Sequence, residues 1–183
     1  MCGFAGFVGE VENREQVLEN MIDTIIHRGP DSSGKFVDED AALGFRRLSI
    51  IDLSESGDQP LYNEDRSKVL VFNGEIYNYQ ELREELIQAG HTFVSNTDSE
   101  TLIHGYEQWG EELVYRLRGM YAFAIWDQKA KRLFSARDIF GIKPLYYAQM
   151  NGTLMFGSEI KSFLEHPKFD KVFNEDALGN YLS

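Results

Sequence analysis

The stretch Met1-Cys2-Gly3-Phe4-Ala5-Gly6-Phe7-Val8-Gly9 is an apolar run with glycine at every third position. This pattern predicts a buried strand that other backbone approaches closely. The run contains Cys2, the only cysteine among the 183 residues. Because a small residue at position 2 permits removal of the initiator methionine, we expect Cys2 to be the first residue of the mature chain. The alternative is a lone buried cysteine, the preferred interpretation at any other position.

An N-terminal cysteine carries a thiol and a free α-amine on the same residue. The α-amine titrates close to neutral pH, so a part of it is available there as a base. A chain-terminal amine that takes the proton from its own side chain is a known way to activate a weak nucleophile. The position of Cys2 therefore predicts nucleophilic catalysis through its sulfur.

The composition indicates a globular chain with an acidic surface. Hydrophobic residues make up 43% and aromatic residues 13%, as in a folded domain with a sizeable core. The formal net charge of −12 argues against nucleic acid and anionic membranes as partners. A single cysteine excludes an internal disulfide and fits a reducing compartment, and no apolar run reaches the roughly 20 residues of a membrane span. We expect one cytoplasmic domain over 1–183.

Hydrophobic spacing predicts helices in the first two thirds of the chain. Apolar residues recur at helical spacing over about 14–27. A second helix is expected to begin at Asn78, with Glu81 three positions on completing a capping box. A third helix is expected to begin at Thr97 or Asp98.

Strands are expected on both sides of these helices, over 41–51, 69–72, 121–126, 133–136, 144–148 and 153–156. The run 69–72 is expected to end abruptly at Asn73-Gly74-Glu75, and Asn151-Gly152 is a strong hairpin signal. The last stretch, 174–183, has a helical pattern. Strands at both ends with helices between them predict an α+β fold with mostly antiparallel sheets.

Two stretches offer groups that suit a substrate near Cys2. Arg47 lies among apolar neighbours in a predicted strand, where a guanidinium is unfavourable unless it reaches a carboxylate of a ligand or of a surface acid. Asn73 and Gly74 place a side-chain amide beside a backbone N–H, the pair of donors that an oxyanion requires. An ordinary Asn-Gly turn has the same two residues, so this pair alone leaves both interpretations open.

The other polar candidates are less specific. Asp98 stands at a predicted helix start, where an isolated aspartate most often caps the helix. The segment 27–34 is dense in turn-forming residues, and His91, His104 and His166 lack the sequence spacing of metal ligands. The sequence also has no phosphate-binding or dinucleotide-binding glycine motif. We therefore expect no metal and no nucleotide cofactor in this chain.

Taken together, the motifs resemble those of class II glutamine amidotransferases, in particular the N-terminal glutaminase domain of glutamine-hydrolysing asparagine synthetases. The resemblance covers nearly all of the chain, in the family's order. It implies the N-terminal-nucleophile hydrolase fold, a four-layer αββα sandwich of two antiparallel sheets. The motifs are Met1-Cys2-Gly3, His27-Arg28-Gly29-Pro30-Asp31, Arg47-Leu48-Ser49-Ile50-Ile51-Asp52, Asn73-Gly74-Glu75-Ile76-Tyr77-Asn78, Asp98, Arg137-Asp138-Ile139-Phe140-Gly141-Ile142-Lys143-Pro144-Leu145-Tyr146-Tyr147 and Ser158-Glu159-Ile160-Lys161.

The resemblance also implies catalytic roles. Cys2 would attack the side-chain amide carbon of L-glutamine, with its own amine moving the proton. Asn73 and the N–H of Gly74 would hold the oxyanion. The products would be glutamate and ammonia, formed through a cysteinyl thioester.

Substrate binding is implied in the same way. Arg47 would bind the α-carboxylate of glutamine, helped by the backbone at Leu48 and Ile50. Glu75 and Asp98 would bind the α-ammonium group. A zwitterionic substrate needs one fixed cation and one fixed anion about a residue's width apart, and this set supplies both.

In the family, the ammonia passes to a C-terminal synthetase domain that uses ATP, Mg²⁺ and aspartate. Its Ser-Gly-Gly-x-Asp-Ser loop does not occur in 1–183, so we expect a synthetase domain or partner chain to accept the ammonia, and a homodimer stays open. Many relatives have histidine where this chain has Phe45, a departure that bears on the subfamily. The alternatives are another class II amidotransferase and a catalytically silent binding module of the same fold.

Overall fold

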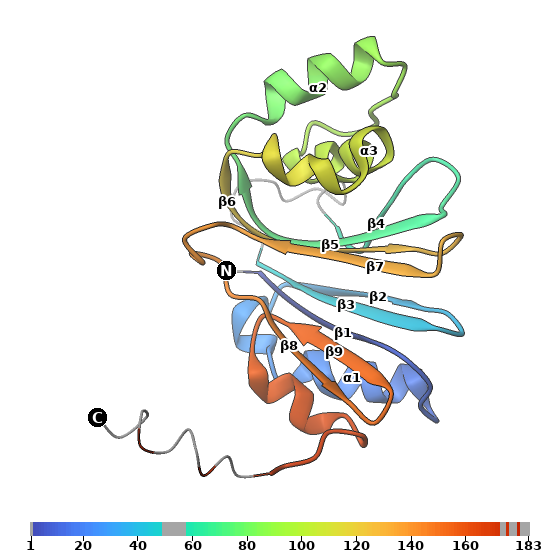
Figure 1. The fold of residues 1–183 in the computed structure, drawn as a ribbon, viewed down its shortest axis with the longest axis vertical. Coiled ribbons are helices and arrows are strands. Elements are labelled where there is room, and N and C mark those ends of the chain that lie inside the picture. Colours follow the sequence, from blue (N-terminus) through green and yellow to red (C-terminus); the bar gives the residue numbers. More distant parts are fainter. Residues whose placement is uncertain (1, 49–57, 173–174, 176–178, 180–183) are drawn as a thin grey trace.

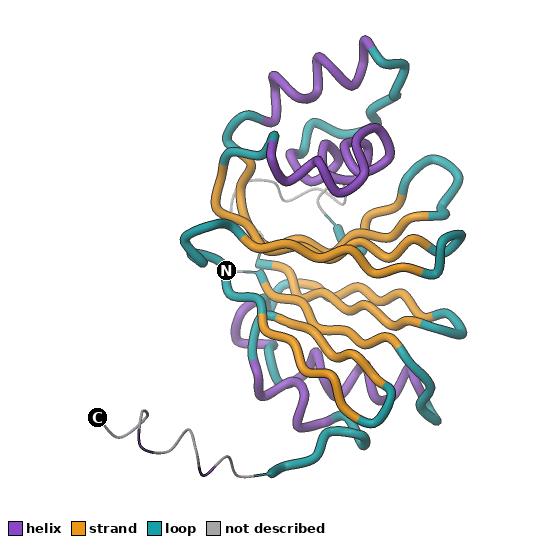
Figure 2. Tube along the Cα trace, in the orientation of Figure 1, coloured by secondary structure: helices purple, strands orange, loops and turns teal. Residues whose placement is uncertain are grey.

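The computed structural model describes residues 2–48, 58–172, 175 and 179. Two antiparallel sheets lie face to face, and helices cover the outer face of each (Figures 1 and 2). The predicted α+β, four-layer αββα architecture is confirmed. None of the helices in this described part combines the length and the hydropathy that a membrane span requires.

The first sheet is built around the strand that the opening run predicts. Its strand order is β2-β3-β1-β9-β8, so β1 lies at the centre. A Cβ atom added at Gly6 of β1 would lie 2.5 Å from the carbonyl oxygen of Ala42, which confirms the predicted close approach of backbone. The strands are β1 (Gly3–Val8), β2 (Ser32–Val37), β3 (Ala41–Arg47), β8 (Tyr146–Met150) and β9 (Thr153–Gly157).

The second sheet has the order β4-β5-β6-β7. The prediction that its central strand ends at Asn73 was wrong. Both Asn73 and Gly74 pair with β6, opposite Ala122 and Tyr121, so cross-strand pairing carries β5 through the Asn-Gly pair to Ile76. The strands are β4 (Leu61–Tyr62), β5 (Lys68–Ile76), β6 (Gly119–Asp127) and β7 (Arg132–Arg137).

The helices follow the predicted order with different ends, and they are α1 (Arg14–Asp23), η1 (Ile26–Arg28), α2 (Tyr79–Gln88), α3 (Asp98–Trp109), η3 (Gly110–Tyr115) and η4 (Ile160–Glu165). The predicted start of α3 is confirmed. The predicted capping box was wrong, because the Asn78 side chain donates to the carbonyl of Arg116 and accepts from the N–H of Arg118. Asn78 thus joins α2 to the segment before β6.

Three layers of apolar side chains hold the sandwich together. One lies between the first sheet and α1. Another lies between the second sheet and the helices α2 and α3, and the third lies between the two sheets. Phe45, in place of the histidine of many relatives, is 2% exposed and belongs to the layer between the sheets. The members of that layer include Phe4, Phe45, Val71, Trp126 and Phe156.

Two strands were not predicted, and one predicted helix cannot be compared. The segment 27–34, interpreted as turns, contains the end of η1 and the first half of β2, and β2 pairs with Ala42 to Arg47 of β3. Strand β4 has only two residues, too few for a periodic signal. The predicted helix over 174–183 lies almost entirely outside the described residues. Asn151 and Gly152 both have positive φ, 50° and 73°, as the predicted hairpin turn between β8 and β9 requires.

Candidate active site

Most of the predicted site residues meet at one cavity of about 290 Å³. Its wall comes from the start of β1, the end of β3, the end of β5 and the start of α3. Figure 1 places the N-terminus at this end of the sandwich, where the two sheets meet. The lining residues are Cys2, Leu48, Gln59, Phe72, Asn73, Gly74, Glu75, Thr97, Asp98, Ser99, Met120 and Lys143.

The sulfur of Cys2 is held beside the backbone of Leu48 and is open to the cavity. The Leu48 N–H donates to Sγ at 3.4 Å, and Sγ lies 3.7 Å from the Leu48 carbonyl oxygen. Cys2 is only partly buried. The thiol therefore faces the cavity while the backbone of Leu48 fixes its position.

The backbone of Cys2 is fixed from the opposite side. Arg28 donates from Nε to the Cys2 carbonyl at 3.1 Å, and its Nη1 lies 3.1 Å from the Glu159 carboxylate. Burial alone would raise the pKa of Glu159, but hydrogen bonds from three basic neighbours, Arg28 among them, outweigh burial and lower it. Glu159 therefore stays ionised and anchors Arg28.

The backbone of Phe4 in β1 is likewise held by Ser158, which follows β9. The Phe4 N–H donates to the Ser158 hydroxyl at 3.1 Å, and the Ser158 N–H donates to the Phe4 carbonyl at 2.8 Å. Sequence reasoning quoted Arg28, Ser158 and Glu159 only as family motifs and assigned them no role. All three are polar residues in segments next to buried strands. Their spacing in the sequence does not indicate that these segments meet in the fold.

Asn73 brings an unused donor to the cavity. Its side chain is 3% exposed, and its Nδ2 finds no hydrogen-bond partner among the residues that the structure describes. A buried amide without a partner is unfavourable by about 1–3 kcal/mol, so its retention indicates a ligand that accepts this hydrogen bond. Gly74 stands next to it, where a Cβ would lie 2.3 Å from the Met120 carbonyl oxygen, so only glycine fits.

Two carboxyl groups, those of Glu75 and Asp98, also line the cavity. The Asp98 carboxylate accepts the N–H of Ile76 at 2.8 Å, which ties the first turn of α3 to the end of β5. Burial raises the pKa of Asp98, the backbone hydrogen bond counteracts this, and the nearby charge of Glu75 adds to the rise. Asp98 is the first residue of α3, and its carboxylate also interacts with the N–H groups of Asp98 and Ser99, so a capping role accompanies its bond to Ile76.

The predicted carboxylate ligand Arg47 lies beside the cavity and not among the residues that line it in the described part. Its Nη1 is 2.8 Å from the half-exposed carboxylate of Asp58, which is the surface-acid alternative, and its binding to the α-carboxylate of glutamine stays a prediction. The next residue, Gln59, does line the cavity, and its amide bonds both the N–H and the carbonyl of Phe72. The predicted contribution of Ile50 lies outside the described residues.

The cavity thus combines a reactive sulfur, a pair of neutral donors and an acidic wall. A sulfur nucleophile and nearby N–H donors suit attack on a carbonyl carbon, because the charge that forms on the oxygen is met by preorganised dipoles. Carboxylates such as Asp98 and Glu75 suit a substrate cation. The arrangement is therefore that of an acyl-transfer site for an amide that carries an ammonium group.

The family model for the glutamine amidotransferase domain matches residues 1–183. Asparagine synthetase [glutamine-hydrolyzing] 1 of Bacillus subtilis is 47% identical over 188 residues, covering 100% of this chain and 29% of that protein. The asparagine synthetase of Zea mays is 44% identical over 167 residues, covering 88% of this chain and 28% of that protein. This chain spans less than a third of the length of these relatives.

Solved structures of lower sequence identity share the fold. The glutamine phosphoribosylpyrophosphate amidotransferase of B. subtilis superposes with a TM-score of 0.75 at 22% identity, covering 88% of this chain and 43% of that one. An allosteric regulatory enzyme of purine biosynthesis gives a TM-score of 0.77, also at 22% identity, over 90% of this chain and 43% of that one. The full-length match and the shared fold show that the chain belongs to the family of glutamine amidotransferase domains.

Proposed function

We propose that this domain hydrolyses L-glutamine to L-glutamate and ammonia. The α-amine of Cys2 takes the thiol proton as the sulfur attacks the side-chain amide carbon, and the carbonyl oxygen becomes an oxyanion. The carbon–nitrogen bond then breaks, the α-amine of Cys2 passes a proton to the leaving nitrogen, and a thioester remains. Water attacks the thioester, which releases glutamate and restores the thiol. Neither a metal nor an organic cofactor takes part in these steps.

The other residues bind the two ends of the substrate. Asn73 Nδ2 and the Gly74 N–H hold the oxyanion, and Asp98 and Glu75 hold the α-ammonium group. Arg47 binds the α-carboxylate with the adjoining backbone of Leu48 and Ile50, in exchange for its ion pair with Asp58. The single observation that carries the proposal is the Asn73 amide, which has no partner among the described residues and lies in the same cavity as the Cys2 sulfur.

A glutamine-like electrophile, in which a reactive ketone replaces the side-chain amide, tests the proposal directly. It should label Cys2 with one equivalent per chain, and excess glutamine should slow the labelling. Intact mass and peptide mapping report both the stoichiometry and the residue. Labelling that glutamine does not slow would contradict a glutamine site.

Replacing Asn73 with alanine should reduce kcat while KM for glutamine changes little. Its amide faces charge that exists only in the transition state, and loss of one such donor reduces kcat by about 10²–10³-fold. Steady-state ammonia release measures both constants. Electrophile labelling should become slow as well, because that reaction also passes through an oxyanion. A variant with raised KM and parent kcat would place Asn73 in ground-state binding.

Replacing Asp98 with asparagine should raise KM for glutamine by about 10–100-fold, because a hydrogen bond to a charged group contributes about 1.5–3 kcal/mol. In the parent, KM should rise as pH falls toward the pKa of Asp98, which burial raises, since protonation removes the charge that binds the ammonium. Asp98→Asn should lose this part of the pH dependence. Glu81→Gln, at an exposed acid of α2, is the matched control.

The same substitution should not lower stability near neutral pH. A carboxyl group whose pKa is raised in the folded state takes up a proton on folding between its ordinary and raised values, and stability falls as pH rises through that window. Above this pH window the buried charge of Asp98 lowers the free energy of unfolding, and asparagine removes that charge. Thermal unfolding of Asp98→Asn at pH 7 should give a midpoint at or above that of the parent, and a clearly lower midpoint would contradict this reasoning.

We further infer that the ammonia is delivered to a synthetase domain or partner chain. The relatives named above are asparagine synthetases, in which this segment is less than a third of the length. A loop with exposed apolar side chains between β7 and β8 offers a contact surface for that partner: Ile139 is 92% exposed and Phe140 is 86% exposed. ATP and Mg²⁺ are assigned to the partner. The lone cysteine favours the reducing cytoplasm, and a homodimer through this loop stays a proposal.

A further inference from the structure

We propose that Glu64, His91, His104 and Glu107 bind a divalent transition metal, of the Zn²⁺ class, away from the glutamine cavity. One ligand atom of each side chain lies within 4.8 Å of all the others. The four residues come from three separate segments around the second sheet and its helices. Glu64 follows β4, His91 lies between α2 and α3, and His104 and Glu107 are one turn apart on α3.

The distances among the four ligand atoms suit tetrahedral coordination. Four ligands at about 2.0–2.1 Å from a zinc ion lie about 3.4 Å from one another. His104 Nδ1 is 3.2 Å from Glu107 Oε2 and 3.7 Å from Glu64 Oε1, and His91 Nδ1 is 3.9 Å from Glu107 Oε2. These three distances lie close to that spacing and the remaining pairs lie within 4.8 Å, so side-chain rotations bring the four atoms together around one ion.

The atoms that face away from this group are held by other residues. His104 turns Nε2 to the buried carboxylate of Glu100 at 3.6 Å, and His91 turns Nε2 to Gln108 at 3.1 Å. Carboxylate and carbonyl partners on the second ring nitrogen are the usual support of metal-bound histidine. They fix Nδ1 of both rings toward the common centre.

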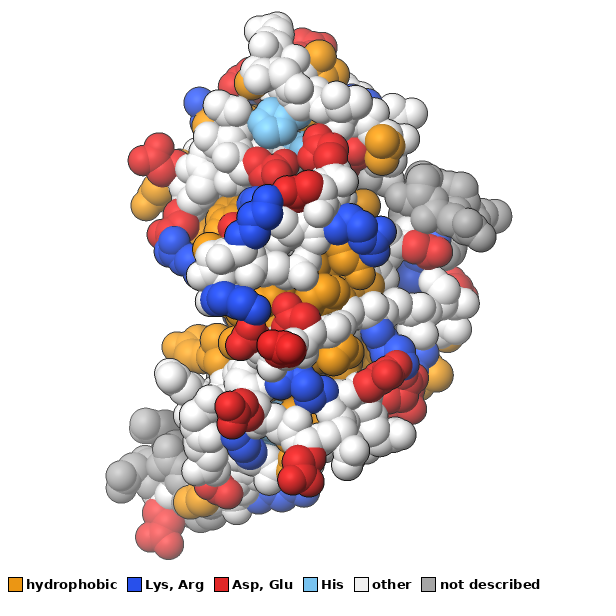
Figure 3. All heavy atoms as spheres, turned by 90° about the vertical axis from the view of Figure 1, so that its right-hand side faces the viewer, with side chains coloured by type: hydrophobic (Ala, Val, Ile, Leu, Met, Phe, Trp, Pro, Cys, Tyr) orange, Lys and Arg blue, Asp and Glu red, His pale blue; other side chains and the backbone are white. Residues whose placement is uncertain are grey.

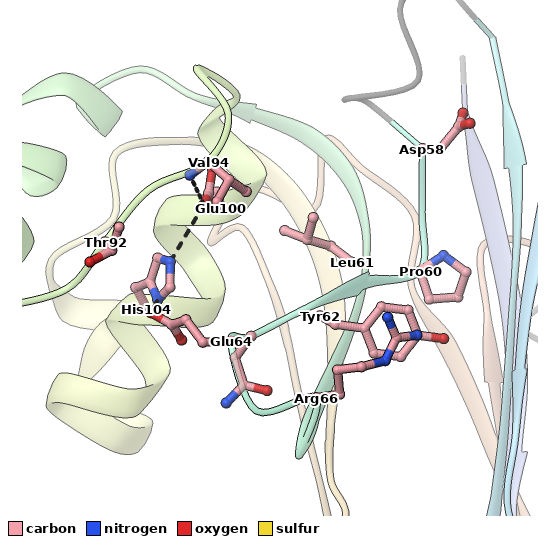
Figure 4. Close-up of a pocket in the computed structure, with 11 residues that line it drawn as sticks. Asp58, Pro60, Leu61, Tyr62, Glu64, Arg66, Thr92, Val94, Glu100 and His104 are labelled. Carbon is pink, nitrogen blue, oxygen red and sulfur yellow. Dashed lines mark hydrogen bonds and ion pairs between the residues drawn. The ribbon is translucent and has the colours of Figure 1, made fainter.

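The two glutamates are supported in different ways. Glu107 receives Asn63 Nδ2 on Oε1 at 2.8 Å, which leaves Oε2 facing the two histidines. Glu64 is the more exposed member, with 52% of its side chain accessible. It lies on the wall of a separate cavity of about 420 Å³, which also includes His104. Figure 4 shows Glu64 reaching His104 at this wall, and the dashed line from His104 to Glu100 on its other side.

Charge and donor type together select the metal. Burial lowers the pKa of His104, but hydrogen bonds to Glu100 and Glu107 outweigh it and raise the pKa to about 9, so a metal ion would displace a proton from this ring. With both imidazoles deprotonated, the two carboxylates give a formal charge of −2, which one divalent ion neutralises. Imidazole nitrogen suits zinc and its neighbours in the first transition row, whereas Mg²⁺ and Ca²⁺ prefer oxygen alone. Figure 3 shows histidine and acidic side chains gathered on one face of the helical half, so an ion has a path from solvent. The competing interpretation is an ion network in which His104 is the cation.

The bound metal would cross-link three segments of the chain. It would join α3 to the β4–β5 hairpin and to the segment that follows α2. Glu100 connects this cross-link to the segment before α3, because its carboxylate also accepts the N–H groups of Val94 and Ser95 at 2.7 Å each. No step of glutamine hydrolysis requires this metal, so the site adds to the proposed function without depending on it.

Zn²⁺ titration of metal-free protein without a polyhistidine tag tests the site. Because the N-terminal cysteine is itself a chelator, calorimetry is run on the parent and on Cys2→Ala. Both should bind one equivalent at the cluster, and zinc should raise the unfolding midpoint of Cys2→Ala while Mg²⁺ should not. Co²⁺ in Cys2→Ala should give the intense visible absorption of a four-coordinate ion.

Variants at the two less buried ligands assign the binding to the cluster. His91→Gln and Glu64→Gln, each in the Cys2→Ala background, should weaken zinc binding by at least about 10-fold, the lower end of what even outer partners contribute. Glu84→Gln, at an exposed acid of α2, is the matched control and should bind as Cys2→Ala does. Absence of saturable zinc binding in Cys2→Ala, or equal affinity in the double variant His91→Gln/Glu64→Gln, would overturn the proposal in favour of the ion network.

Discussion

Replacing Cys2 with alanine is expected to abolish glutamine hydrolysis, with a loss on the order of 10⁵-fold or more, as when the nucleophile of a covalent mechanism is removed. The fold should persist. The Cys2 side chain is partly exposed at the cavity and bonds only the backbone of Leu48 in the described structure. The contacts that fix the start of β1, from Arg28 and Ser158, reach the backbone and survive the substitution.

Ammonia release and thermal unfolding measure the two halves of this expectation. Cys2→Ser is the informative companion, because it keeps an oxygen nucleophile of similar size and should retain little activity near neutral pH. Circular dichroism and unfolding midpoints of all three proteins should agree closely. Parent-like ammonia release by Cys2→Ala would show that another group attacks the amide.

Blocking the α-amine of Cys2 should be as harmful as removing its thiol. An N-terminal extension that cannot be processed converts the amine into an amide, which has no lone pair available as a base. The chain should fold, since the strand pairing of β1 begins at Gly3. The expected result is a stable protein that neither releases ammonia nor reacts rapidly with the glutamine-like electrophile.

The matched control carries the same extension behind a protease site that leaves Cys2 as the first residue. Cleavage should restore ammonia release in the same sample, which separates the chemistry of the amine from damage during preparation. Intact mass before and after cleavage verifies the N-terminus. Full activity of the uncleaved protein would assign the proton transfer to a different group.

The sequence predicted an element correctly where the residues of that element alone show its pattern. The glycine spacing of β1, the apolar face of α3 and the Asn151-Gly152 turn each follow from a few neighbouring residues, and each is confirmed. Pairing across the sheet decided the rest. The first half of β2 has residues typical of turns, yet it forms a strand because it pairs with β3, and β5 continues past Asn73 because it pairs with β6.

The candidate site shows the same limit. Cys2, Asn73, Gly74 and Asp98 could be predicted because family motifs mark them, and they do line one cavity. The support of Cys2 by Arg28 and Glu159 could not, since 131 positions separate the two partners in the chain. The proximity of His91 and His104, whose ring centroids are 5.2 Å apart, was missed as well, because the turn between α2 and α3 creates it.

The place of β1 at the centre of its sheet has a consequence for synthesis. One neighbour, β3, follows after α1, η1 and β2, but the other is β9, and Phe4 is bonded to Ser158 over 154 positions. At about 5–20 residues per second, the ribosome needs roughly 8–30 s between making β1 and making β9. During that interval the thiol of Cys2 has no completed cavity around it. A nascent chain is therefore expected to have no complete cavity for the proposed reaction until nearly all of this domain has been translated.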